Sequence, residues 1–158
     1  MEDFLPDLDQ LKTGRSLDAG RIAFRDTGCA QCHRFEGQGG TVGPDLAGVG
    51  RRLKAREVLE SILLPSKVIA DGYADTVVET AGGAVVTGRI EREDDRVLVL
   101  RPPSGEAVTV PKKEIVDRRK SDVSNMPPGI VNVLQKDQVL DLVAYLLSDP
   151  PPTTPEKK

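Results

Sequence analysis

Three segments of the 158-residue chain repeat apolar residues at the spacing of an α-helix. They are residues 16–28 (SLDAGRIAFRDTG), 55–67 (AREVLESILLPSK) and 136–148 (KDQVLDLVAYLLS). The apolar face of the last segment consists of Val139, Leu140, Val143, Leu146 and Leu147, widened by Leu142 and Tyr145. We expect this helix to cross the helix that carries Gly20 and Phe24, because the small Gly20 permits a close approach.

Residues 75–120 have a different pattern, with five short runs rich in Val and Ile between Gly-Gly, Asp-Asp and Pro-Ser-Gly turns. The runs are residues 75–81, 84–92, 96–101, 106–111 and 114–120, and a tight turn is expected at PKKE. Because closure removes the exposed edges of such a sheet, the pattern predicts a small closed antiparallel five-stranded β-barrel. The fold class is then α+β overall, mainly α and interrupted by this barrel.

Composition excludes some classes of partner. The formal net charge is -3, acids and bases are interleaved, and the predicted strands contain no aromatic residue, so neither nucleic acid nor a membrane surface is an expected partner. No apolar run is long enough for a membrane span. The first ten residues lack the features of a signal peptide, and the proline-rich, charged tail 150–158 is expected to be disordered.

Both cysteines and the only histidine lie in one five-residue window, CAQCH, at residues 29–33. A redox dithiol uses this Cys spacing, but such a site follows a strand in a βαβ pattern, and here a helical segment precedes it. Zinc needs three or four protein ligands, and the chain has no further Cys or His to complete the set. C-x-x-C-H is the attachment pattern of haem c, in which two thiols bind the porphyrin and the histidine binds iron.

Two later segments supply what such a pocket needs. In the loop GGTVGPDLAGVGRRL, residues 39–53, the carbonyl of Pro44 can accept a hydrogen bond from His33 Nδ1 and orient the ring, although an ordinary surface loop has a similar composition. Met126, in the proline-flanked turn SNMPPG, is the expected second axial ligand. The alternative is a methionine that fills a gap in the core.

Taken in order, Gly20, Phe24, CAQCH, GPDL, the Met-Pro turn and the DLVAYL helix resemble a class I cytochrome c. The resemblance implies that Cys29 and Cys32 form thioethers to one haem c, that His33 and Met126 ligate its iron, and that Pro44 supports His33. Leu46 is expected to line the ring, as are Val49, Leu53 and Leu64. Arg51 and Arg52 fall where such proteins often meet a haem propionate, but a solvated pair at a helix start has the same sequence.

The segment between the predicted helix 55–67 and the Met loop does not belong to a small cytochrome. His33 and Met126 are 93 residues apart, and omitting residues 70–121 leaves 41, an ordinary spacing for the family. With this insertion, the chain resembles the haem-binding domain of planctomycetes and verrucomicrobia, and the barrel resembles Sm-like or Tudor-like folds. The predicted domains are a discontinuous cytochrome c domain, 1–69 with 122–149, and an inserted barrel, 70–121, whose flanks lie close together.

The expected function is electron transfer by one haem, with no substrate transformed and therefore no enzymatic activity. The resemblance implies a redox partner protein, such as a dehydrogenase module or an electron acceptor, and covalent haem attachment implies a periplasmic or equivalent extracytoplasmic compartment. The barrel is expected to shield a haem edge or to make a protein contact, such as that of a homodimer. Two alternatives stay open: a haem sensor or small-gas-binding protein in which Met126 is displaced, and a recognition module that uses haem for structural support.

Overall fold

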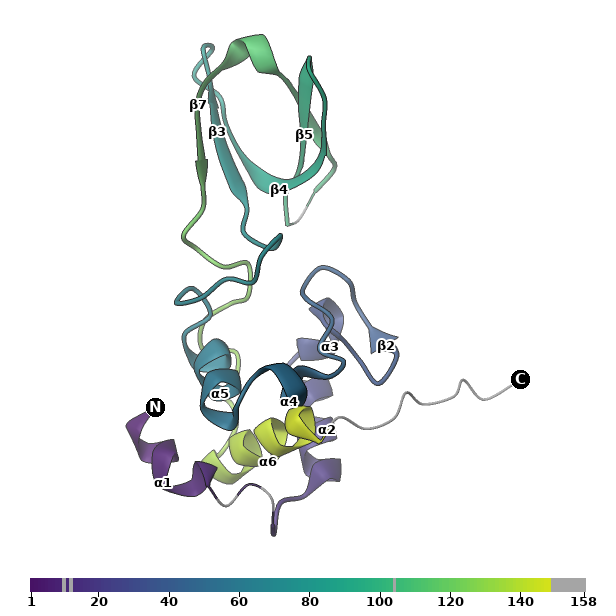
Figure 1. Cartoon of the computed structure of the whole chain (residues 1–158), viewed down its shortest axis with the longest axis vertical. Coiled ribbons are helices and arrows are strands. Elements are labelled where there is room, and N and C mark those ends of the chain that lie inside the picture. Colours follow the sequence, from purple (N-terminus) through teal and green to yellow (C-terminus); the bar gives the residue numbers. More distant parts are fainter. Residues whose placement is uncertain (10, 12, 104, 149–158) are drawn as a thin grey trace, which may run out of the picture. The chain divides into compact units, whose positions relative to one another are not determined.

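The computed structural model describes residues 1–9, 11, 13–103 and 105–148, so the predicted disordered tail 150–158 lies outside the described residues. The chain divides into two compact units (Figure 1). Unit 1 comprises residues 1–67 and the described residues from 127 onwards, and unit 2 comprises residues 68–126. No helix within the described ranges combines the length and the apolar character that a membrane span requires.

Unit 1 is helical. It contains a 3₁₀ turn, η1 (Glu2–Phe4), the helices α1 (Leu5–Leu8), α2 (Leu17–Asp26), α3 (Cys29–Cys32), α4 (Val49–Arg52), α5 (Ala55–Leu63) and α6 (Lys136–Leu147), and a two-residue antiparallel pair, β1 (Arg34–Phe35) and β2 (Gln38–Gly39). The predicted helices in 16–28, 55–67 and 136–148 are thus confirmed as α2, α5 and α6. α2 begins where the Ser16 hydroxyl accepts a hydrogen bond from the Ala19 N–H, which satisfies a donor in its first turn.

The helix α6 forms the centre of unit 1 and packs against α2, α4 and α5. Its crossing with α2 lies at Gly20, as predicted, because a Cβ atom there would collide with the Asp141 carbonyl oxygen and lie 2.5 Å from Tyr145 Cβ. Beside the crossing, the rings of Phe24, Phe35 and Tyr145 pack edge to face or tilted, with centroids 5.1–6.1 Å apart. This aromatic cluster anchors the strand that follows the CAQCH segment against the two long helices.

Unit 2 is a five-stranded antiparallel sheet with the strand order β6-β5-β4-β3-β7. Its strands are β3 (Thr76–Thr80), β4 (Val85–Glu93), β5 (Val97–Arg101), β6 (Val108–Pro111) and β7 (Ile115–Lys120), and a 3₁₀ turn, η2 (Lys112–Glu114), occupies the predicted PKKE turn. The long strand β4 pairs with β3 through its first half and with β5 through its second half, and a register shift at Ile90–Arg92 interrupts the pairing with β5. A small aliphatic core fills the inner face, made of Val78, Leu98, Leu100 and Val110 with Val86 and Ile115 against them.

The prediction of a closed barrel is wrong, because the sheet is open between β6 and β7. β7 offers only Ile115 to the core, and its remaining five residues are exposed. Without an apolar stripe on β7, there is little to bury by drawing β6 against it. The edge is instead protected by charge, since β7 ends in Asp117, Arg118, Arg119 and Lys120.

The two segments that lead into and out of the sheet are tied together inside unit 2. The Ser121 N–H donates to the Asp75 carbonyl (2.8 Å), and the Asn125 side-chain amide donates to the Asp75 carboxylate (3.0 Å). Asp75 is only 3% exposed, and the bond from Asn125 gives its buried carboxylate a donor. The flanks of the sheet therefore lie close together, as predicted.

Candidate functional site

The CAQC residues form a single helical turn, α3, and His33 follows it in an extended conformation. Gly28 starts this turn with a left-handed backbone (φ 82°), which glycine adopts without strain. Cys29 and Cys32 are three residues apart in the turn, so their side chains project from the same side of the helix. Cys29 is buried, Cys32 is exposed, and neither is in a disulfide. The turn therefore presents two thiols and an imidazole in succession.

The His33 ring is oriented by the loop that follows it. The distance from His33 Nδ1 to the carbonyl oxygen of Pro44 is 2.8 Å, so the predicted hydrogen bond is present. A carbonyl can only accept, which means that Nδ1 carries the proton and Nε2 is the nitrogen with a lone pair for a metal ion. Because the Pro44 carbonyl accepts this bond, the imidazole becomes a stronger electron donor to a metal ion.

Gly43 makes the contact between loop and ring possible. A Cβ atom at this position would lie 2.6 Å from His33 Cε1 and 2.8 Å from Nδ1, closer than side chains pack. The Gly43 N–H donates to the Cys32 carbonyl (2.8 Å), and the Gly40 N–H donates to the Ala30 carbonyl (3.0 Å). The loop is thus fastened to the carbonyl groups of α3 and forms a wall against the imidazole. Sequence reasoning did not single out Gly43, although a glycine directly before the accepting proline is the signal that could have identified it.

The environment of Cys29 argues against a redox dithiol. Burial raises the pKa of the Cys29 thiol, whereas a redox-active cysteine needs a lowered one. The thiol lies 3.3 Å from the Thr27 hydroxyl, which itself lies 2.7 Å from the Ala23 carbonyl and donates to it. The preceding element is the helix α2, and no strand leads into the cysteines. Nothing in the sequence pattern pointed to Thr27.

A zinc site is not supported either. Within the described part of the chain, no group of three or more His, Cys, Asp or Glu side chains is placed to hold a metal ion. An iron ion bound inside a porphyrin needs only axial ligands from the protein, and His33 supplies one nitrogen for that purpose.

The other predicted site residues in unit 1 lie in or near the loop. The Leu46 N–H donates to the Arg34 carbonyl (2.9 Å), which places Leu46 beside the CAQCH segment. The Arg52 guanidinium donates to the carbonyls of Asp45 (3.1 Å) and Ala47 (3.2 Å) and so holds the loop in shape. Arg51 and Arg52 form the last turn of α4 rather than a helix start. The guanidinium of Arg51 is next to Gly48.

Met126 is the last residue of unit 2 and lies in the loop between β7 and α6. Its N–H donates to the Ser124 hydroxyl (3.1 Å), and its side chain is partly buried. Two prolines follow it in the sequence, which restricts the backbone on its C-terminal side.

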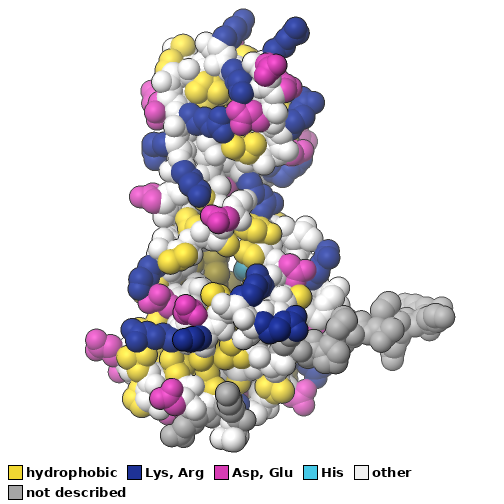
Figure 2. All heavy atoms as spheres, in the orientation of Figure 1, with side chains coloured by type: hydrophobic (Ala, Val, Ile, Leu, Met, Phe, Trp, Pro, Cys, Tyr) yellow, Lys and Arg dark blue, Asp and Glu magenta, His cyan; other side chains and the backbone are white. Residues whose placement is uncertain are grey.

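Unit 1 also leaves apolar side chains exposed that a bound ring could cover. Val42 in the loop is 47% exposed, and Leu64, at the end of α5, is 49% exposed. Figure 2 shows hydrophobic side chains, in yellow, among charged ones on the face of the molecule that also shows the histidine in cyan. Two thiols one helical turn apart, an imidazole with Nε2 available and exposed apolar side chains are the donors and the surface that haem c requires. The residues present therefore fit this group.

Comparison with known proteins agrees with this reading. The family model described as Cytochrome c matches residues 17–97, which is half of the chain. The matched region contains α2, the CAQCH turn and the loop that orients His33. A search of curated proteins found no match.

Proposed function

The chain belongs to the cytochrome c family of haem-binding electron carriers, and from this premise we propose that it carries one haem c, attached through Cys29 and Cys32, with His33 and Met126 as the axial ligands of the iron. When bound, the haem supplies a one-electron couple between ferric and ferrous iron. We further propose that the protein transforms no substrate and is therefore not an enzyme. The observation that carries the proposal is the His33 Nδ1 to Pro44 hydrogen bond of 2.8 Å on a C-x-x-C-H turn.

Each residue of the turn has a separate task in this proposal. The Cys29 and Cys32 thiols would hold the porphyrin through thioether bonds, formed by adding S–H across its vinyl groups without an oxidant. Pro44 and Gly43 hold the imidazole with little freedom to rotate, so that Nε2 would be available to the iron. A ligand held in one orientation reduces the rearrangement that accompanies a change of charge on the metal.

Met126 is proposed as the second ligand for chemical and local structural reasons. The chain contains two methionines, and the other is Met1. The bond from the Met126 N–H to Ser124 and the two following prolines restrict the backbone that presents the thioether. A thioether ligand favours ferrous iron and raises the reduction potential, as an electron carrier with a His/Met set requires.

The proposal is tested with visible spectra of the mature protein and of two variants, Met126→Ala and Val123→Ala. Val123 is 65% exposed in the same loop, so its truncation serves as the matched control. We expect the wild type and V123A to have the ferric absorption band near the red edge of the visible spectrum that marks iron–thioether ligation. M126A should lose this band, have a lower potential and bind CO rapidly when ferrous.

Three results would contradict parts of the proposal. A wild-type protein that lacks the band and takes up CO as fast as M126A would favour the alternative, a haem sensor or small-gas-binding protein. A mature protein whose intact mass equals that of the polypeptide alone would remove the haem, and with it the function. Sluggish electron exchange with every soluble redox protein tested would favour a recognition module.

We also propose a setting for this carrier. The resemblance to the planctomycete and verrucomicrobial haem-binding domain supports an extracytoplasmic compartment and a dehydrogenase module or an electron acceptor as redox partner. In this reading unit 2 is an Sm-like insertion into the cytochrome and makes a protein contact, such as a homodimer interface. Deleting residues 70–121 tests this role: partner kinetics and oligomeric state that do not change would dismiss it.

A further inference from the structure

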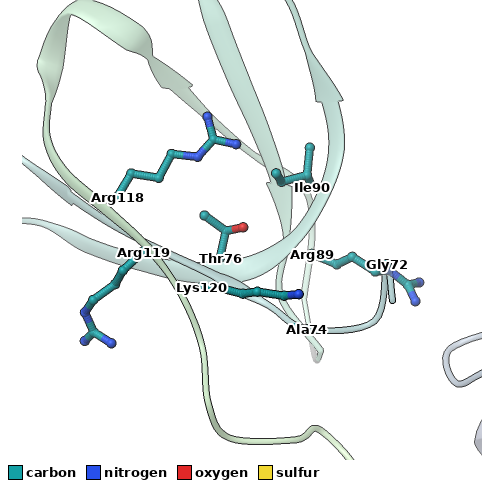
Figure 3. Close-up of a pocket in the computed structure, with 8 residues that line it drawn as sticks. All are labelled: Gly72, Ala74, Thr76, Arg89, Ile90, Arg118, Arg119 and Lys120. Atoms are coloured by element: carbon teal, nitrogen blue, oxygen red, sulfur yellow. The ribbon is translucent and has the colours of Figure 1, made fainter. Parts of the chain in front are cut away.

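The inner face of the sheet in unit 2 continues beyond its aliphatic core into an open hollow of about 470 Å³. Residues from the segment before β3 and from β3, β4 and β7 line it: Gly72, Ala74, Thr76, Arg89, Ile90, Arg118, Arg119 and Lys120. In Figure 3, Arg118, Ile90, Thr76 and Lys120 surround a common space, whereas the side chains of Arg89 and Arg119 are directed away from it. All of these residues belong to one unit, so the hollow is a feature of the sheet itself.

The register of the sheet explains why cations face the hollow. In the antiparallel pair of β3 and β7, Val78 is opposite Arg118 and Thr76 is opposite Lys120. Residues opposite one another share a face of the sheet, and Val78 is a core residue. Arg118 and Lys120 therefore lie on the inner face, directly beyond the point where the apolar core ends.

The charge of the lining is one-sided. Four of its eight residues are Arg or Lys, and within the described part of the chain no acidic side chain lines the hollow. Glu93 partly neutralises Arg118 from outside the lining through two hydrogen bonds of 2.8 and 3.0 Å, and the same bonds hold the guanidinium in place. No carboxylate of the described residues pairs with Lys120.

Arg89 also lines the hollow, but its side chain is directed away from the common space, because it lies between Gly88 and Ile90 of the inner face. Its guanidinium carbon lies 5.3 Å from the centre of the Tyr73 ring, a cation–π distance, so the aromatic ring positions this cation on the opposite wall. The base of the hollow contains Thr76, 8% exposed, and Ile90, 39% exposed. A hydroxyl and an apolar side chain are thus available beside the positively charged groups.

We propose that this hollow binds a small-molecule oxyanion with two or more negative charges, a phosphate or a polycarboxylate. Its volume is within the range of small-molecule pockets, roughly 300–1,000 Å³, and larger than a single monovalent ion requires. Arg side chains match the planar or tetrahedral oxygens of these groups through paired N–H donors, and Lys120 adds a point charge.

The test is isothermal titration calorimetry of the full-length mature protein at low ionic strength, with inorganic phosphate in one arm and citrate in the other. The variant is Lys120→Gln, which removes an exposed charge without touching the core. Lys113→Gln is the matched control, since Lys113 is an exposed cation of the same unit in η2 that does not line the hollow. A second variant, Arg89→Gln, examines the opposite wall.

We expect saturable binding that weakens roughly tenfold or more in K120Q, because the loss of one charge-assisted hydrogen bond has an effect of this size. Binding should weaken less in R89Q, whose guanidinium is directed away from the common space, and should be unchanged in K113Q. Binding in only one arm supports the proposal and identifies phosphate or carboxylate as the ligand chemistry. Heat from neither anion, or equal weakening in K113Q and K120Q, overturns it, because equal weakening is the signature of diffuse surface charge. The readout needs no electron transfer, so it is independent of the proposed function.

Discussion

Replacing Gly43 with alanine would place a methyl group against the His33 imidazole. The new Cβ would lie 2.6 Å from Cε1 and 2.8 Å from Nδ1, whereas ordinary van der Waals contact begins at 3.4 Å. The ring or the loop must therefore move by about 0.8 Å. A shift of that size takes Nδ1 away from the Pro44 carbonyl, to which it is now 2.8 Å distant.

The expected cost follows from these contacts. Overpacking a filled site costs about 1–3 kcal/mol, and the loss of a hydrogen bond costs about 0.5–1.5 kcal/mol. Alanine returns about 0.4–1 kcal/mol by restricting the unfolded chain, since Gly43 does not have a positive φ. The free energy of unfolding should thus fall by roughly 1–4 kcal/mol. The reduction potential should rise, because an imidazole without the Pro44 bond is a weaker base and stabilises ferric iron less.

The assay is denaturant unfolding of the mature protein, followed by haem absorbance and by circular dichroism, together with a redox titration. Gly82→Ala is the matched control: its Cβ would meet nothing closer than Thr80 Oγ1 at 3.9 Å, and Gly82 has no positive φ. G82A should be as stable as the wild type or slightly more so. If G43A and G82A unfold together and have equal potentials, the loop does not hold the ring and the reasoning is refuted.

Two further predictions concern the packing of each unit. Gly20→Ala should destabilise unit 1 by about 1–3 kcal/mol in urea unfolding, because the Asp141 backbone cannot move aside for the new methyl group. This loss exceeds the gain in helix propensity, which is about 1 kcal/mol for alanine over glycine. A more stable variant would contradict the close crossing of α2 and α6. Hydrogen bonds from Arg118 and then Lys112 lower the pKa of Glu93 from 4.5 to about 2. The ionised carboxylate therefore stabilises the sheet at pH values above 4.5, and this contribution is lost as the pH falls from 4.5 towards 2. Glu93→Gln should make the free energy of unfolding of unit 2 less dependent on pH in this window. The NMR signals of Val78 and Leu98 report this unfolding. An unchanged pH profile would argue against the ion pairs.

The helices and the CAQCH turn were predictable because their signals are local. The apolar spacing in KDQVLDLVAYLLS depends on residues within one element, and the structure confirms the helix α6 at Lys136–Leu147. The small size of Gly20 was enough to identify where α2 and α6 cross. The Pro44 contact was also predictable, because only ten residues separate it from His33 and the loop has few ways to return.

The closure of the sheet was not predictable in the same way. Alternation and turn residues located the strands, but whether β6 meets β7 depends on how much apolar surface would be buried between them. Apart from Ile115, the residues of β7 are exposed. Which of them face the core side of the sheet is decided by the register of β7 against β3. The same register turns Arg118 and Lys120 towards the hollow.

The amino-acid sequence by itself determined the chemistry of this protein, because two thiols and an imidazole in five consecutive residues have a fixed covalent spacing whatever surrounds them. Only the tertiary structure decided which glycine contacts the imidazole, which carboxylate holds Arg118, and that the sheet stays open at one edge. Those features depend on how separate elements and loops pack against one another, and their free energies are set by packing and register rather than by any local pattern.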